Sequence, residues 1–92
     1  MAEFDSRISD RHAASALDAV AKYDAEPATN RLSRKVYLTE AINDAMAAGV
    51  AHFQASVAAG YLPRAMPHDG GISVLVALHQ AGFKVVRDRS KK

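Results

Sequence analysis

Apolar residues recur at helical spacing through the middle of the chain and predict its longest helix. Seven of them fall on one face of a helix with about 3.6 residues per turn: Leu38, Ile42, Ala45, Met46, Gly49, Phe53 and Val57. We expect this helix to end at Ala59, because Gly60 suits the left-handed conformation that follows many helices and Pro63 cannot continue one. Two residues are suitable N-terminal caps, Ser33 and Thr39.

The length of this helix conflicts with the size of a compact domain. A helix from Ser33 to Ala59 would span roughly 39 Å. A compact domain of 92 residues has a radius of gyration of about 12 Å and a diameter of about 30 Å. Three arrangements resolve the conflict: a strand over residues 34–38 followed by a helix from Thr39, a break near Gly49, or a helix that projects into a partner.

A shorter helix is predicted before the long one. It covers residues 11–23, where apolar positions again form a stripe, and Ser9 or Asp10 can cap its start. The residue before Pro27 is biased out of the helical region, so residues 24–30 are expected to form a loop.

Another short helix is predicted near the C-terminus, over residues 72–81, after a loop rich in proline and glycine at 61–71. It is apolar nearly all round, which is typical of a buried helix. We expect Gly82 to close it in a Schellman-type turn, with Phe83 packing back on Leu78.

The two terminal segments carry strand patterns. Residues 4–8 alternate between apolar and polar side chains, and residues 83–87 contain the β-branched pair Val85 and Val86. The predicted fold is therefore mainly α, small α+β, with three helices and one or two short strands from the terminal segments. Because a two-stranded sheet is weak alone, we expect it to be completed across a homodimer or backed by the helices. Residues 1–92 form one small globular domain with a frayed basic tail at 88–92.

The composition predicts a thin core and contact with another subunit. Hydrophobic residues make up 49% of the chain, but many are alanines, which bury little area each. Two segments carry no charge, residues 45–63 and 70–83; the first is too polar to span a membrane. Small side chains let another backbone approach closely, so we expect self-association through Ala48, Ala51 and Ala55.

Positive charge gathers in two places. The net charge is +2, but residues 1–44 sum to −2 and residues 83–92 to +4. The candidate residues for binding a protein partner or nucleic acid are six cations: Arg31, Arg34, Lys35, Lys84, Arg87 and Arg89. If the last strand pairs near the start of the long helix, they merge into one patch for phosphates or an acidic protein surface. The alternative is a tail that only keeps the protein soluble.

No motif indicates catalysis, a metal site or a cofactor. The chain has no cysteine, and none of its four histidines lies four residues from another: His12, His52, His68 and His79. A Ser-His-Asp set could be drawn from Ser56 or Ser73 with His79 and Asp69, but no nucleophile-elbow sequence accompanies it. We therefore expect no enzyme activity, no catalytic residues, no metal and no cofactor.

The first half of the chain resembles a ribbon-helix-helix repressor. The resemblance runs over residues 4–46: an alternating segment, a helix that contains residues 16–21 and a second helix after Ser33. It implies a dimer that binds DNA or RNA through basic residues. Two features depart from the pattern: a longer connection over residues 24–32 replaces the tight turn between the helices, and the ribbon is poor in basic residues.

Taken together, these patterns predict a small cytoplasmic interaction protein. The first residues contain no apolar run typical of a secretory signal, and no membrane partner is expected. The protein is expected to be an adaptor or inhibitor that binds a macromolecular partner, a class that includes small phage-type proteins blocking host complexes. The alternative is a dimeric DNA- or RNA-binding protein of ribbon-helix-helix-like type.

Overall fold

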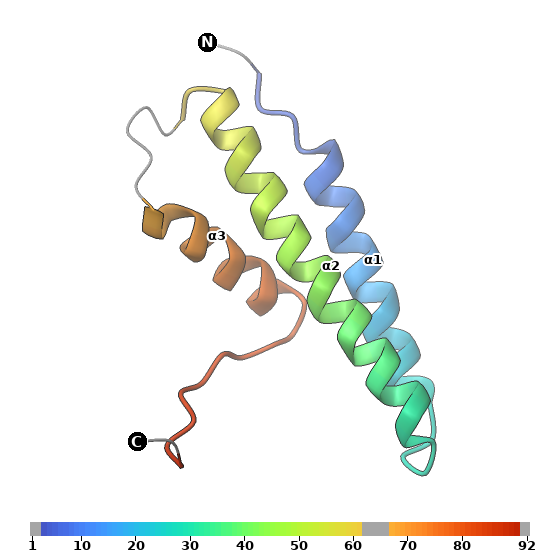
Figure 1. Ribbon diagram of the computed structural model, residues 1–92. Helices are drawn as coiled ribbons and strands as arrows, with labels where there is room; N and C mark the ends of the chain where they lie inside the picture. Colours follow the sequence, from blue (N-terminus) through green and yellow to red (C-terminus); the bar gives the residue numbers. More distant parts are fainter. Residues whose placement is uncertain (1–2, 62–66, 91–92) are drawn as a thin grey trace.

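The computed structural model describes residues 3–61 and 67–90, and these contain three helices. Helix α1 covers Arg7–Ala25, α2 covers Arg31–Ala58 and α3 covers Pro67–Gln80. Helices α1 and α2 form an antiparallel hairpin, and α3 returns across the second half of α2 (Figure 1). Both α1 and α3 pack on α2 while hardly contacting each other. The mainly α prediction is confirmed.

Each helix begins earlier than its cap residues suggest. Helix α1 begins after Ser6, whose carbonyl accepts the first helical hydrogen bond from the Asp10 backbone N–H at 2.8 Å. Helix α2 begins after Asn30, not at Ser33 or Thr39. Ser6 and Asn30 are of the residue types preferred at this position, but neither makes a side-chain cap hydrogen bond.

The start of α3 corrects the predicted loop over residues 61–71. The helix already begins at Pro67, so Gly70 and Gly71 are helical. Proline suits the first helical position, because its fixed φ is already helical and its missing N–H has no partner there. Asp69 lies in the first turn of α3, where a negative charge is favourable.

The helix ends follow the glycine signals closely. Gly60 and Gly82 adopt positive φ angles of 83° and 93°. At the end of α3, the Phe83 N–H donates to the Leu78 carbonyl at 2.9 Å and the Gly82 N–H to the His79 carbonyl at 3.0 Å, which is the Schellman pattern. The predicted turn and the packing of Phe83 against the core around Leu78 are confirmed.

The predicted strands are not found in the described part of the chain. Residues 3–6 and 83–88 have no regular structure. Phe4 instead packs edge-on against the His52 ring, with centroids 5.0 Å apart. Val85 and Val86 are 61% and 69% exposed, because no second strand lies beside them to form a ladder.

The long helix is continuous, so neither a break at Gly49 nor a strand at 34–38 resolves its length. Its 28 residues are accommodated because the molecule is elongated, with principal extents of 51, 37 and 15 Å. Gly49 serves packing instead: a Cβ built on it would lie 2.6 Å from Val74 Cα and 2.8 Å from the Ser73 carbonyl oxygen. The missing side chain lets α3 lie directly against the backbone of α2.

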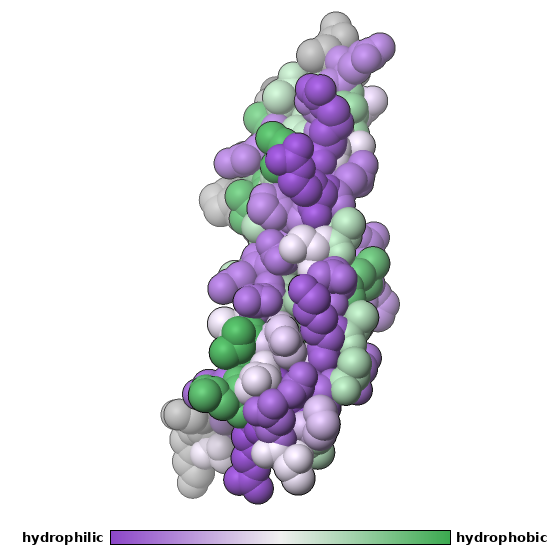
Figure 2. Space-filling model, turned by 90° about the vertical axis from the view of Figure 1, so that its right-hand side faces the viewer, coloured by the Kyte–Doolittle hydropathy of each residue, from purple (hydrophilic) through white to green (hydrophobic). Residues whose placement is uncertain are grey.

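The core is small and built mainly from alanine. Its buried cluster consists of Ala16, Ala45, Leu78 and Ala81, with Ile42, Val74 and Phe83 partly buried against it. No large side chain in the described residues is fully buried. The face at the right of Figure 1, on the side of α1, is mainly hydrophilic, with scattered apolar residues (Figure 2). The thin core predicted from the composition is present.

Candidate functional site

An apolar groove runs across the described surface of the molecule. It encloses about 450 Å³ and is lined by residues of all three helices. Since α1 and α3 hardly touch each other, the groove lies between them, with α2 as its floor. We call it the α1/α3 groove.

The groove exists because alanines occupy the positions where larger side chains would fill the space between the helices. Six alanines line it, two from α1, two from α2, one from α3 and one directly after the end of α3: Ala13, Ala16, Ala45, Ala48, Ala77 and Ala81. Each pair is spaced by three or four residues, so its members lie on one side of their helix. A row of alanines is apolar but short, so it lines the groove without filling it.

The groove has larger apolar side chains beside these alanines, and they remain half exposed. Leu17 of α1 is 54% exposed, and Ile72 and Val76 of α3 are 52% and 49% exposed. These side chains leave the groove open to solvent rather than closed over a cavity. A contiguous apolar surface of this kind is typical of a contact site.

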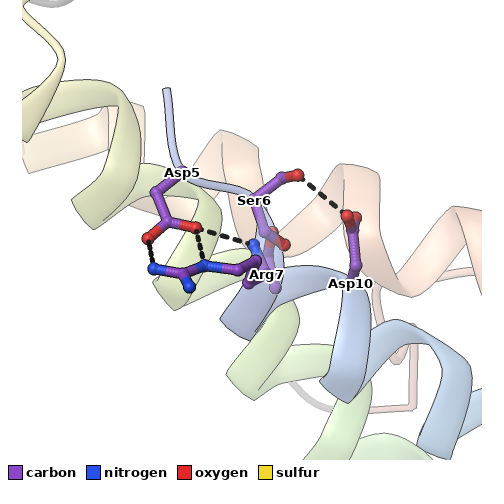
Figure 3. A network of polar contacts seen from close by, with 5 residues as sticks. Asp5, Ser6, Arg7 and Asp10 are labelled. Carbon is purple, nitrogen blue, oxygen red and sulfur yellow. Dashed lines mark hydrogen bonds and ion pairs between the residues drawn. The ribbon is translucent and has the colours of Figure 1, made fainter. Parts of the chain in front are cut away.

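Polar groups line the remainder of the groove, and Asp10 is the charged residue among them. The Asp10 carboxylate accepts a hydrogen bond from the Ser6 hydroxyl at 2.8 Å (Figure 3). Beside it, Asp5 accepts hydrogen bonds from the Arg7 guanidinium at 2.9 and 3.0 Å and from the Arg7 backbone N–H at 3.1 Å. These contacts lower the pKa of Asp5 to about 2, and the paired carboxylate raises the pKa of Arg7.

A second polar cluster joins α1 to α2. The Asp44 carboxylate accepts a hydrogen bond from the Ser15 hydroxyl at 2.7 Å, and its other oxygen lies 3.3 Å from His12 Nδ1. Serine and histidine both contact the carboxylate and not each other, so the hydroxyl is not aimed at an imidazole that could take its proton. This arrangement joins α1 to α2. Its partners are about thirty residues apart in the sequence, so no local pattern predicted it.

The three cations near the start of α2 lie together. Arg31, Arg34 and Lys35 line a shallow depression of about 260 Å³ with residues of α1 and the connecting loop. The Arg34 guanidinium carbon lies 4.2 Å from the centre of the Tyr23 ring, a cation–π contact. Its Nε is buried and has no hydrogen-bond partner. No acidic residue occupies the first turn of α2, so this end of the helix is strongly positive.

The other three predicted cations lie elsewhere. Lys84, Arg87 and Arg89 are exposed on the segment after α3, which extends away from the start of α2 (Figure 1). The strand pairing that would have merged the two groups is not formed. Asp88 lies among these cations and accepts hydrogen bonds from the Ser90 N–H and hydroxyl at 2.9 and 2.5 Å, which lower the pKa of its carboxyl group. Lys91 and Lys92 lie outside the described residues.

Comparison with known proteins finds no matching family model, curated protein or solved structure. The function is therefore inferred from the α1/α3 groove and from the two groups of cations, at the start of α2 and after α3.

The structure separates the three alanines predicted for self-association. Ala48 is 5% exposed and lines the α1/α3 groove. Ala51 and Ala55 are half-buried along α2 and do not line the groove. The sequence does contain a signal for the groove, namely alanine pairs three or four residues apart in α1, in α2 and at the end of α3, where the second member, Ala81, follows the helix.

The four histidines and the hypothetical Ser-His-Asp set do not converge. Asp69 and His79 lie in the first and last turns of α3, about 15 Å apart along its axis. Residues 3–61 and 67–90 contain no group of three or more histidines, cysteines or carboxylates placed to hold a metal ion. Within the same residues, no helix is long and apolar enough to cross a membrane.

Proposed function

We propose that this protein is a non-enzymatic interaction protein, an adaptor or inhibitor, that accepts a helix of a macromolecular partner in the α1/α3 groove. The observation that carries the proposal is the groove itself, with its six alanines and half-exposed larger side chains. An amphipathic helix commonly binds by laying its apolar face into such a groove. Covering each half-exposed side chain contributes on the order of 1 kcal/mol.

The exposure of the groove favours a helix over a small molecule. Small-molecule sites bury most of the ligand surface, whereas Leu17, Ile72 and Val76 are about half exposed. An added helix would lie beside α1 and α3 on α2 and complete the layer. The proposal includes a cytoplasmic location, since a chain without cysteine gains nothing from an oxidising compartment.

The proposal is tested with a synthetic peptide of leucine and lysine at helical spacing, which has one apolar face. We expect micromolar binding, of about 8 kcal/mol, measured by fluorescence anisotropy of the labelled peptide. Val76→Asp should abolish binding, because it puts a charge into the groove. Val36→Asp is the matched control, since Val36 is 47% exposed on α2 but lies outside the groove. Equal effects of the two variants would contradict the proposal.

The second candidate is a dimeric protein that binds DNA or RNA through its basic residues. Arg31, Arg34 and Lys35 favour it, since they gather at a helix start without any acid. The ribbon of the ribbon-helix-helix pattern is not formed at residues 4–8, so the candidate rests on the cations.

Salt dependence separates this second candidate from helix binding. Affinity for a DNA duplex or an RNA should fall steeply between about 50 and 200 mM salt. Replacing Arg31 and Lys35 with glutamine should lower both the affinity and its salt dependence, whereas Val76→Asp should change neither. Absence of binding to any duplex or single strand at low salt would remove this candidate.

A further inference from the structure

The molecule is more extended than a self-sufficient domain of its length. Its radius of gyration is 15.3 Å, whereas about 12 Å is expected for a compact chain of 92 residues. The shortest of its extents is 15 Å, enough for roughly two layers of helix backbone at an interaxial spacing of about 8–10 Å. Within residues 3–61 and 67–90, no third layer covers the groove.

The accessible surface is correspondingly large. It measures 7060 Å², whereas a folded monomer of 9.9 kDa exposes about 5,200 Å². The exposed segment over residues 84–90 accounts for part of the difference of roughly 1,900 Å². That difference lies within the range of about 1,000–2,500 Å² that each subunit of an obligate homodimer buries. Even as an upper bound that includes this segment, the surplus surface is of the size that a stable dimer needs.

Helix α3 has an apolar and uncharged outer side that lies beside the groove. One side packs on α2 through Val74 and Leu78. No charged residue occurs between Asp69 and Lys84, so its outer side has none of the charges that normally face water. It carries three half-exposed apolar side chains instead: Ile72 at 52%, Leu75 at 51% and Val76 at 49%.

We propose that two copies of this chain associate about a two-fold axis, each inserting α3 into the α1/α3 groove of the other. The inference rests on the proposed function, because it names the helix that the groove accepts. The leucine–lysine peptide then competes with α3 of the second copy, so its binding is measured at chain concentrations low enough to dissociate the dimer. Each α3 then lies between its own α2 and the second copy, so both of its sides are buried. The contact uses the same surface twice and closes after two copies, which leaves no open face for further growth.

The test is sedimentation equilibrium of the full chain. Wild type should have twice the chain mass of 9.9 kDa. Val76→Asp should weaken the dimer on the order of 100-fold or more, since it buries two unpaired charges per dimer. Val36→Asp, equally exposed but outside the groove, should remain a dimer. Circular dichroism of each variant checks that the helices persist.

A second variant tests the same contact without adding charge. The chain has no cysteine, so a single introduced thiol reports only on its own surroundings. Val76→Cys, near the middle of the α3 side that lines the groove, should be joined to its copy by a short bis-maleimide cross-linker. Val36→Cys should not be joined at the same concentration.

The outcomes separate this inference from the proposed function. A monomeric wild type that still binds the leucine–lysine peptide, with the binding lost in Val76→Asp, would overturn the dimer and leave helix binding in place. A dimer unaffected by Val76→Asp and not cross-linked through Val76→Cys would also overturn it, because association would then use another face. A monomer that binds no peptide would overturn both.

Discussion

The α1–α2 hairpin and helix α3 both pack on α2, but their outer sides differ. The hairpin is joined by polar contacts, with Asp44 holding Ser15 and His12, and Arg34 stacked on Tyr23. Its outer surface on the α1 side is mainly hydrophilic (Figure 2). The α1 side of the hairpin therefore has the charge distribution of a surface adapted to water.

Helix α3 is held against α2 by close apolar packing instead. It approaches α2 so closely at Gly49 that no Cβ fits there, and it contributes Leu78 to the core. Beyond its first turn it offers water no charged residue. The difference teaches that exposure alone does not identify a contact surface; exposure combined with missing charge does. The predictions below test whether α3 depends on packing and the hairpin on polar contacts.

The largest effect is expected from Leu78→Ala. Leu78 is 9% exposed and belongs to the core cluster between α2 and α3, so the change should lower the free energy of unfolding by about 2–5 kcal/mol. Leu32→Ala removes the same atoms from a residue that is 76% exposed and should change it by less than about 0.5 kcal/mol. Urea denaturation followed by circular dichroism measures both. Equal losses would show that α3 does not depend on this packing.

Gly49→Ala should have the next largest effect. The added Cβ would lie 2.6 Å from Val74 Cα, so α3 must move away from α2, at a cost of about 1–3 kcal/mol in unfolding free energy. Gly71→Ala is the control within α3, because a Cβ there meets nothing within 4 Å. It should stabilise the helix by about 0.5–1 kcal/mol. A stabilising Gly49→Ala would refute the close approach of the two helices.

A smaller loss is expected from Asp44→Asn, which tests the polar side of the comparison. The amide cannot accept from both Ser15 and His12, so unfolding free energy should fall by about 0.5–1.5 kcal/mol. Asp18→Asn breaks only an exposed pair with Lys22 of the same helix and should matter less. Thermal unfolding of the two variants gives the ranking, and the reverse order would contradict the role of Asp44 in joining the helices.

The smallest effect concerns Asp5 at the start of the hairpin. Its pKa is lowered from 3.8 to about 2 by hydrogen bonds from Arg7, so the pair stabilises the segment above pH 3.8 and loses this contribution as the pH falls towards 2. Arg7→Gln should return the pKa of Asp5 towards 3.8. Carboxyl chemical shifts in an NMR titration follow it, and an unchanged pKa would mean that the pair does not form in solution.

Local backbone chemistry was predictable from the sequence, and distant contacts were not. Gly60 and Gly82 end their helices as predicted, because the left-handed conformation is a property of glycine itself. The helix starts were predicted too late, since Ser6 and Asn30 have the same cap-forming character as Ser9 and Ser33 further along the chain, and residue type alone does not tell which of them precedes the helix. The strands were wrong because Val85 and Val86 have β propensity but no neighbouring strand.

For the α1/α3 groove, the sequence predicted the kinds of residue that line it but not which residues come together. The uncharged segments and the abundance of alanine indicated a contact surface, but only Ala48 of the three alanines chosen lines the groove. Periodicity along one helix does not say where two other helices leave a gap. The contact of Asp44 with Ser15 and His12 crosses about thirty residues and has no local signature. The length of the long helix conflicts only with a compact, nearly spherical domain, and this molecule is elongated.

The uneven cover along α2 has a consequence for its dynamics. All of its buried residues lie between Ala41 and Ser56, whereas its first ten residues have none. The rate of amide hydrogen exchange should therefore fall along this one continuous helix. It should be fast over its first ten residues, which we call the positive tip, and slow where α1 and α3 pack on it. The tip can open locally without releasing α3, so the end that carries Arg31 and Lys35 is free to adjust while the groove keeps its shape.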